Sequence, residues 1–218
     1  MSMRRILKIM MGVAIMVPLS SCHGIFDGIY DEPIVEENDG FGFIKVDEAL
    51  RTGTIYIDAS DYTQWHYIDF KSHTVTDTYY ADDCPQAWDF AIHRYDTKTN
   101  GGKVAETDCT ELEKTPAPTL IPESDFVTDI WTENKITVDM SGMMQGNILY
   151  APDYYNACLS QWLDVDTSSM PPSYTLSGKV YVLRLTDGTY AALQLVNFMN
   201  DAAIKGYMTI NYIYPIKQ

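Results

Sequence analysis

The sequence predicts an all-β fold made mostly of antiparallel strands, with one or two short helices. From about Gly42 onward, short runs rich in Ile, Val, Tyr, Thr and Trp alternate with polar residues. A period of two is typical of strands with one buried face. Helical spacing of apolar residues is poor throughout. The expected strands are residues 54–57, 65–69, 88–94, 135–139, 179–185, 190–198 and 205–214.

Turn chemistry predicts two hairpins. Asp187-Gly188 joins two strong strands, and Asn100-Gly101-Gly102 follows the strand that begins at Trp88. Both sequences tolerate the positive φ angles that tight turns of the primed types require. Residues 124–132 and 153–162 are the candidates for short helices, while residues 115–122 and 165–173 carry Pro and small polar residues typical of loops. No repeat of solenoid or propeller length is visible.

The first 21 residues predict a signal peptide. Arg4, Arg5 and Lys8 precede an apolar run over residues 9–19. About 11 apolar residues reach only about half of a bilayer core, so a spanning helix is not expected. The end of this run, Leu19-Ser20-Ser21-Cys22, resembles a bacterial lipobox, in which Cys22 is acylated and becomes the mature N-terminus. The alternative is an ordinary secreted protein that is cleaved nearby and carries a free cysteine.

The mature chain is strongly acidic. The whole sequence has 15 Lys plus Arg and 30 Asp plus Glu, a formal charge of −15, and removal of Arg4, Arg5 and Lys8 makes it −18. Basic residues are scattered, so a nucleic-acid partner is excluded. Residues 22–41 are acidic and without periodicity, which indicates a flexible tether. Residues 42–218 are expected to form the folded domain.

Several kinds of catalytic or metal site are not supported by motifs. The sequence lacks the serine-nucleophile elbow, the phosphate loop and the dinucleotide fingerprint, and carboxylate pairs among 30 acidic residues carry no signal, so an enzyme is not predicted. The histidines lie outside zinc motifs: His23, His66, His73 and His93. Besides Cys22 there are three cysteines, Cys84, Cys109 and Cys158; one pair is able to form a disulfide, but the odd number leaves the pairing open.

Four methionines fall in a window of 31 residues, at Met140, Met143, Met144 and Met170. Met140 continues the alternation of Ile136 and Val138 and is assigned to the core. The other three lie in segments without apolar periodicity, so we expect them in loops. Aromatic residues gather around this window: Trp131, Tyr150, Tyr154, Tyr155, Trp162 and Tyr174. Methionine often only fills gaps in a core, but loop thioethers among aromatic rings suit a flat apolar ligand with a soft acceptor, such as haem.

Three stretches resemble the HmuY haemophore family of Bacteroidetes. They are DASDYTQWHYIDF at residues 58–70, AWDFAIHRYDTKTNGG at 87–102, and PPSYTLSGKVYVLRLTDGTYAALQ at 171–194. As an ordered set these stretches are fairly specific. The resemblance implies an all-β lipoprotein of the outer membrane, exposed on the cell surface. Such a protein captures haem (iron protoporphyrin IX) from host haemoproteins and passes it to a TonB-dependent outer-membrane receptor.

The resemblance also implies the iron ligands. The founding member of the family uses two histidines in the matching loops, whereas no histidine follows His93 in this sequence. Relatives with paired methionines indicate Met143 and Met170, with Met144 as a rival for the first position, while His93 is interpreted as structural. Thioether ligands predict tighter binding of ferrous haem. The competing interpretation is a surface lipoprotein that binds a protein or a glycan through its Tyr-rich loops and takes no haem.

Overall fold

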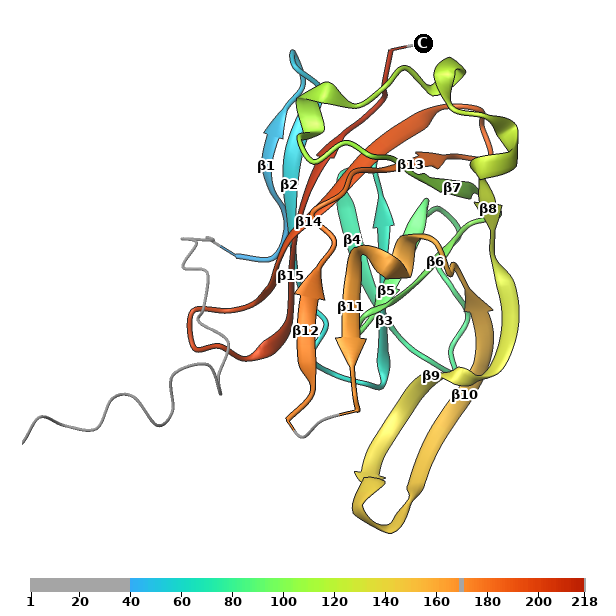
Figure 1. Cartoon of the computed structure of the whole chain (residues 1–218), viewed down its shortest axis with the longest axis vertical. Helices are drawn as coiled ribbons and strands as arrows, with labels where there is room; N and C mark the ends of the chain where they lie inside the picture. The colour runs from blue at the N-terminus through green and yellow to red at the C-terminus, as the bar shows by residue number, and fades with distance from the viewer. Residues whose placement is uncertain (1–39, 169–170, 218) are drawn as a thin grey trace, which may run out of the picture. The chain divides into compact units, whose positions relative to one another are not determined.

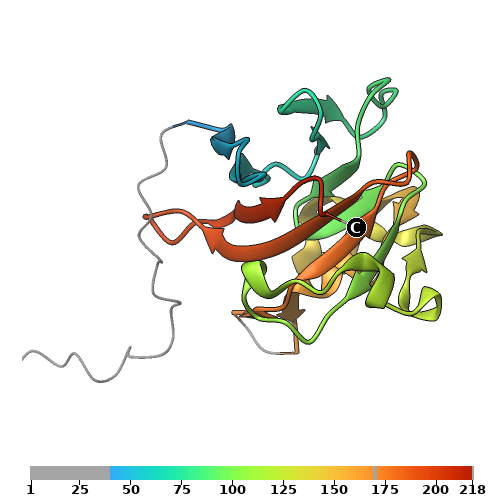
Figure 2. The same ribbon diagram turned by 90° about the horizontal axis from the view of Figure 1, so that it is seen from above.

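The computed structural model describes residues 40–168 and 171–217, and within these residues the protein is an antiparallel β fold with short 3-10 helices (Figure 1). The larger sheet has seven strands in the order β1-β2-β15-β14-β13-β7-β8. Its strands are β1 (Gly42–Asp47), β2 (Thr52–Asp58), β15 (Lys205–Ile213), β14 (Tyr190–Met199), β13 (Tyr181–Arg184), β7 (Lys103–Glu106) and β8 (Val127–Thr128). In the view from above, the orange-to-red strands β13 to β15 run through the middle of the described domain (Figure 2).

A smaller sheet and two hairpins complete the domain. The four-stranded sheet has the order β4-β3-β5-β6, from β4 (Thr74–Tyr79), β3 (Gln64–Asp69), β5 (Phe90–His93) and β6 (Asp96–Thr99). The long hairpin joins β9 (Ile130–Gly142) to β10 (Asn147–Tyr155), and the short hairpin joins β11 (Leu163–Asp166) to β12 (Ser173–Leu176). The 3-10 helices are η1 (Leu112–Lys114), η2 (Pro118–Leu120), η3 (Glu123–Asp125), η4 (Met143–Gln145) and η5 (Leu159–Trp162).

The main hydrophobic core combines inward-facing residues of both sheets. Ile55 of β2, Phe90 of β5 and Leu193 of β14 belong to one cluster, and each has no exposed surface. Leu159 and Trp162 of η5 join this cluster and are also fully buried. Burial of an aliphatic or aromatic side chain of this size stabilises the fold by about 1.5 to 3 kcal/mol, so η5 is anchored although it is only one turn long.

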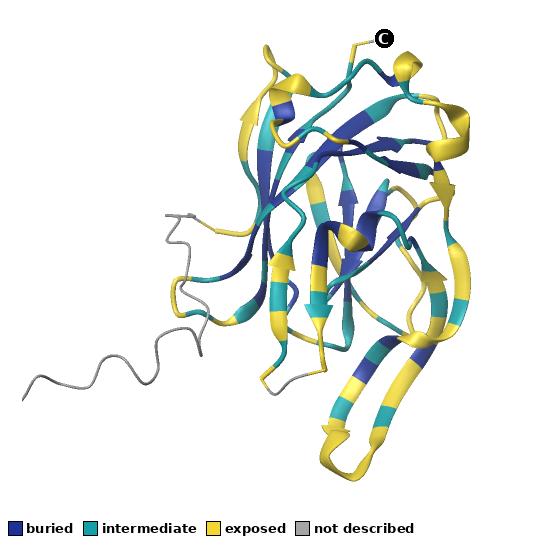
Figure 3. Cartoon of the chain, in the orientation of Figure 1, coloured by how far each residue is buried: buried dark blue, intermediate teal, exposed yellow. Residues whose placement is uncertain are grey.

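A second cluster attaches the long hairpin to the smaller sheet. Trp65 and Tyr67 of β3 and Ala91 of β5 pack with Ile136 of β9. Residues Trp65 to Ile68 are therefore all buried, because one face of β3 meets the main core and the other meets the hairpin. The far end of the hairpin extends beyond both sheets and is largely exposed (Figure 3).

All seven predicted strands are present, and the turn at Asp187-Gly188 joins β13 to β14 as predicted. The hairpin predicted at Asn100-Gly101-Gly102 is wrong, because this turn carries the chain from β6 in the smaller sheet to β7 in the larger one. Gly102 suits this crossover, since a Cβ there would lie 2.7 Å from the carbonyl oxygen of Arg184.

The two helical segments are shorter than predicted. Residues 124–132 contain only the end of η3 and then enter β8 and β9, and residues 153–162 contain the end of β10 followed by η5. The described part of the chain contains no helix that is long and apolar enough to cross a membrane. The predicted signal peptide, Cys22 and most of the acidic tether lie outside the described residues.

Candidate functional site

A cavity of about 470 Å³ lies between the two hairpins and the β5–β6 turn, and we call it the hairpin cavity. Its wall includes residues from β9 (Lys135, Thr137, Met140), β10 (Tyr155), β11 (Leu163, Asp164, Val165), β12 (Tyr174) and the β5–β6 turn (His93, Arg94, Tyr95, Asp96). Three other cavities, of about 270, 520 and 580 Å³, have no methionine in their walls. The hairpin cavity is therefore distinguished by its residues and not by its size.

Met140 lines the hairpin cavity and is only partly buried, so its assignment to the core is wrong. Ile136 and Val138 are buried as the alternation predicts. The pairing of β9 with β10 is irregular next to Met140, because the three residues 147–149 of β10 oppose the four residues 139–142 of β9. An extra residue of this kind is a β-bulge, which redirects side chains near it. A methionine sulfur thus borders the cavity at a position that periodicity alone assigns to the core.

Met143 and Met144 lie at the tip of the long hairpin, in η4. Both are exposed, as expected for a loop, but Met144 is 83% exposed and Met143 only 37%. Neither is among the residues that line the hairpin cavity. Met170 lies outside the described residues.

The aromatic residues expected near the methionines divide into three groups. Tyr155 and Tyr174 line the hairpin cavity. Trp162 is fully buried in the main core. Trp131, Tyr150 and Tyr154 are exposed and do not line this cavity, and the rings of Trp131 and Tyr154 pack edge to face with centroids 5.3 Å apart. Tyr62 and Tyr95, which are far from the methionines in the sequence, supply further rings to the wall.

His93 is fully buried and is one of the residues that line the hairpin cavity. Its Nε2 lies 2.7 Å from the carbonyl oxygen of Tyr62. Since a carbonyl only accepts hydrogen bonds, Nε2 carries the proton and Nδ1 is the bare nitrogen. Burial lowers the pKa of His93 to about 4, against a smaller opposing effect of the hydrogen bond to Tyr62. A neutral ring tied to the backbone agrees with a structural role.

Asp96 also lines the hairpin cavity and pairs with His93 between β5 and β6. Burial raises the pKa of Asp96 to about 7, although the charge of Lys135 partly lowers it. The carboxyl group is therefore largely protonated below neutral pH. An aspartate that changes charge near pH 7 inside a cavity is a feature that sequence patterns do not show.

Arg94 forms the bend of the β5–β6 turn, with a φ of 55°. Its Nη1 donates hydrogen bonds to the carbonyl oxygens of Ser60 and Lys205, both at 3.1 Å. This close approach requires a glycine at position 206, because a Cβ on Gly206 would lie 2.5 Å from the same nitrogen. Arg94 thus joins the smaller sheet to the start of β15.

Within the described residues, no group of three or more His, Cys, Asp or Glu side chains is arranged to hold a metal ion. The thiols of Cys84, Cys109 and Cys158 are all free, so the structure contains no disulfide among them. Burial raises the pKa of the Cys158 thiol to about 11. Thioether and aromatic groups, rather than a carboxylate or histidine cluster, are therefore the distinctive chemistry next to the hairpin cavity.

The family model for the HmuY protein matches residues 61–212, which include the smaller sheet, both hairpins, the hairpin cavity and the larger sheet apart from β1 and β2. The chain belongs to the HmuY family. The match confirms the resemblance and the all-β fold predicted from the sequence. No curated protein matches the chain.

Solved structures of HmuY-like proteins share this fold. A candidate lipoprotein from Bacteroides fragilis is 50% identical, with a TM-score of 0.77, over 82% of this chain and 97% of that one. A candidate HmuY-like haem-binding protein from Bacteroides vulgatus is 51% identical, with a TM-score of 0.76, over 82% and 100% of the two chains. The apo HmuY analogue of Tannerella forsythia is 25% identical, with a TM-score of 0.66, over 76% and 96%.

Proposed function

We propose that this protein is a haem-binding lipoprotein that captures haem without catalytic turnover. The observation that carries the proposal is the hairpin cavity, which lies between two hairpins and is lined by Met140 and by four tyrosine rings: Tyr62, Tyr95, Tyr155 and Tyr174. Support also comes from membership of the HmuY family and from the 51% identical relative described as haem-binding. A flat ring system fits between aromatic walls, and thioether sulfur is an established axial ligand of haem iron.

Met143 and Met170 are the proposed axial ligands. Met143 is favoured over Met144 because it is the less exposed of the two. Met140 is an additional sulfur that lines the cavity, so it competes for the role on the long hairpin. When bound, haem would supply the iron, and the protein would supply the two sulfur ligands and the apolar walls that exclude water.

The test is a haem titration followed by the Soret band, with the iron oxidised and then reduced by dithionite. Met143→Ala and Met170→Ala are expected to lose the spectrum of paired thioether ligation and to bind haem more weakly. Met144→Ala is the matched control for Met143→Ala, since it removes a neighbouring and more exposed thioether. Unchanged spectra and affinities in Met143→Ala and Met170→Ala would overturn the two-methionine site, and a change in Met140→Ala alone would transfer the role to that residue.

We also propose a membrane anchor, a haem source and a haem receptor for this protein. Cys22 would be acylated and would anchor the domain in the outer membrane through the acidic segment of residues 22–41. The domain would take haem from host haemoproteins and deliver it to a TonB-dependent receptor. Metabolic labelling with a fatty acid tests the anchor, because the label should disappear in Cys22→Ala. Transfer of haem from methaemoglobin to the purified domain, followed by difference spectra, tests capture.

A protein- or glycan-binding function is the alternative. The exposed pair of Trp131 and Tyr154 favours it, because aromatic rings on a surface are typical of interaction sites. The absence of a Soret shift with haem, together with loss of partner binding in Trp131→Ala, would support this alternative over haem capture.

A further inference from the structure

The cavity of about 520 Å³ lies at the turn between β6 and β7, and we call it the crossover cavity. Its wall combines two aromatic rings, Trp88 and Tyr154, with two carboxylates, Asp129 and Asp153. Among the described residues, none lines both this cavity and the hairpin cavity. Tyr154 and Tyr155 are neighbours on β10 but line different cavities, since successive side chains of a strand point to opposite faces. The crossover cavity is therefore separate from the proposed haem site.

The two rings of the crossover cavity are each held by another ring. Trp88 packs edge to face with Tyr67, with ring centroids 5.0 Å apart. Tyr154 packs in the same way with Trp131, at 5.3 Å. Trp88 is partly exposed and Tyr154 is exposed. Rings that are fixed and still accessible offer a flat apolar surface, so a ligand stacks on them without a large cost in side-chain ordering.

The two carboxylates of this cavity are also held in place. Thr99 donates to Asp129 from its backbone N–H at 2.7 Å and from its hydroxyl at 3.1 Å, and Asn156 donates from Nδ2 at 2.8 Å. Asp153 accepts from the Lys98 ammonium at 2.8 Å and from the backbone N–H of the next residue at 2.6 Å. The two oxygens of a carboxylate accept about four hydrogen bonds. Each group therefore has capacity for a donor from a ligand.

The charges of the wall indicate the class of ligand. Two carboxylates, Asp129 and Asp153, face one ammonium, that of Lys98. This excess and the formal charge of −15 on the whole chain repel an anionic ligand. A cationic ligand would meet Lys98, whose ammonium is buried against Asp153 and lies 4.0 Å from the ring of Trp65. A neutral ligand with hydroxyl donors is repelled by neither charge.

We propose that the crossover cavity binds a neutral sugar in its pyranose form. A pyranose has a face of C–H groups that stacks on an aromatic ring, and its hydroxyls donate hydrogen bonds to carboxylates. Trp88 and Tyr154 supply the stacking surfaces, and Asp129 and Asp153 supply the acceptors. The volume of the cavity suits a small ligand, because such sites typically enclose about 300 to 1,000 Å³.

The experiment uses Cys84, whose exposed free thiol also lines the crossover cavity. The purified chain is alkylated with iodoacetamide in the presence of the methyl pyranosides of glucose, galactose, mannose or N-acetylglucosamine, and the rate at each cysteine is measured by peptide mass spectrometry. At least one of these sugars should slow the alkylation of Cys84. Cys109 is the internal control, because it is also free but does not line this cavity. Methyl glucuronide, which carries a carboxylate, should protect Cys84 less than the best neutral sugar.

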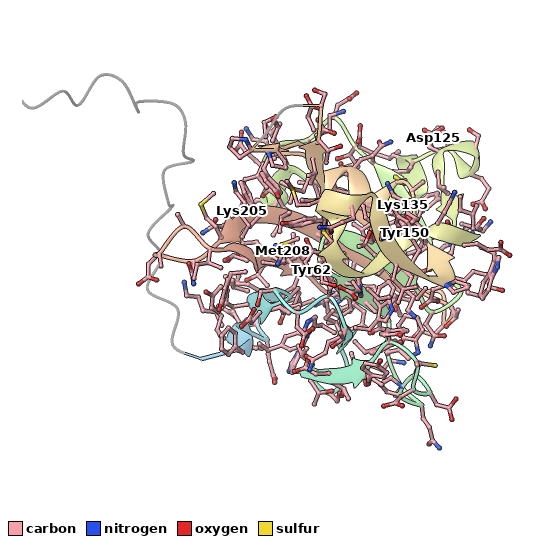
Figure 4. All side chains as sticks on the ribbon, turned by 90° about the horizontal axis from the view of Figure 1, so that it is seen from below. Tyr62, Asp125, Lys135, Tyr150, Lys205 and Met208 are labelled. Atoms are coloured by element: carbon pink, nitrogen blue, oxygen red, sulfur yellow. The ribbon has the colours of Figure 1, made fainter. Side chains whose placement is uncertain are left out.

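Variants of Tyr154 test the stacking surface. Tyr154→Ala should raise the sugar concentration that gives half-protection of Cys84 about threefold to tenfold, as for the loss of one aromatic contact. Tyr154→Phe keeps the ring and should behave like the unchanged protein. Tyr150→Ala is the matched control, since Tyr150 is another exposed ring of the long hairpin (Figure 4) but does not line this cavity.

Three outcomes would each overturn the sugar site. The first is that none of the neutral sugars protects Cys84. The second is that methyl glucuronide protects it as well as the best neutral sugar does. The third is that Tyr154→Ala has no larger effect than Tyr150→Ala. The haem titrations are independent of all three, because haem is proposed for the other cavity.

Discussion

The ammonium of Lys98 lies 2.8 Å from a carboxylate oxygen of Asp153 and so joins β6 of the smaller sheet to β10 of the long hairpin. Both side chains are largely buried, with 8% and 18% of their surface exposed. The same ammonium lies 4.0 Å from the centroid of the Trp65 ring. The position of the hairpin, and with it one wall of the hairpin cavity, therefore depends on a charge pair that water hardly reaches.

Removing one partner of this pair should lower the free energy of unfolding more than removing both. Asp153→Asn leaves the Lys98 charge buried, and the free energy of unfolding should fall by about 3 kcal/mol. A double variant, Lys98→Met with Asp153→Leu, should recover most of this loss because no unpaired charge remains. Urea unfolding of both variants measures the difference. Equal stability of Asp153→Asn and the unchanged protein would show that the pair is solvated in solution.

The raised pKa of Asp96 predicts that the free energy of unfolding falls as the pH rises. Its pKa is about 7 in the folded protein against an ordinary value of 3.8, so the folded state binds the proton more tightly than the unfolded state. The contribution of this group to stability is complete below about pH 4 and is lost as the pH rises through 7. Asp96→Asn should therefore stabilise the haem-free protein at pH 8 by about 1 to 3 kcal/mol.

The same variant should show little gain at pH 4, where Asp96 is protonated in both states. Urea unfolding at pH 4, 6 and 8 measures this profile. Asp164→Asn, on the exposed rim of the same cavity, is the control. If Asp96→Asn raises the free energy of unfolding no more at pH 8 than at pH 4, the raised pKa of Asp96 is contradicted.

Thioether ligation predicts a preference for reduced iron. The affinity for ferrous haem should exceed that for ferric haem by about tenfold or more, because sulfur is a soft ligand. Replacement of the two proposed ligands, by Met143→His with Met170→His, should reduce or reverse this preference. Anaerobic titrations with and without dithionite measure both affinities. If the ratio of ferrous to ferric affinity is the same in the unchanged protein and the double variant, these two methionines are not the source of the preference.

Gly206 is expected to be intolerant of a side chain. Its φ is 105°, and a Cβ would lie 2.5 Å from Nη1 of Arg94 and 2.9 Å from the Cα of Ser60. Gly206→Ala should therefore lower the free energy of unfolding by more than about 2 kcal/mol. Gly178→Ala is the control, since Gly178 also has a positive φ, of 66°, but has open space around it. It should cost only about 1 kcal/mol from the backbone conformation. Equal losses of stability in the two variants would mean that the Arg94 side chain moves and makes room for the added Cβ.

Local patterns predicted the strands well where one face is buried. The alternation in β14 and β15 and the Asp187-Gly188 turn are local properties, and the structure confirms them. Strands with little buried surface, such as β4 and β10, were missed because they show no clear alternation. The Asn100-Gly101-Gly102 turn was predicted in the correct place, but sequence does not state which sheet each flanking strand joins.

The candidate site was predicted less completely than the fold. The methionine-rich window identified the long hairpin, but a bulge in β9 moved Met140 from the core to the cavity wall. Asp96 gave no sign of its altered proton affinity, because that depends on burial by distant segments.

The pairing of β2 with β15 constrains when the molecule acquires its structure. The hydroxyl of Thr54 donates to the side-chain oxygen of Asn211, across a separation of 157 positions. The centre of the larger sheet cannot assemble until nearly the whole polypeptide is available, and contacts of such long range slow folding. β2 therefore lacks its partner on this edge of the sheet until β15 has been synthesised.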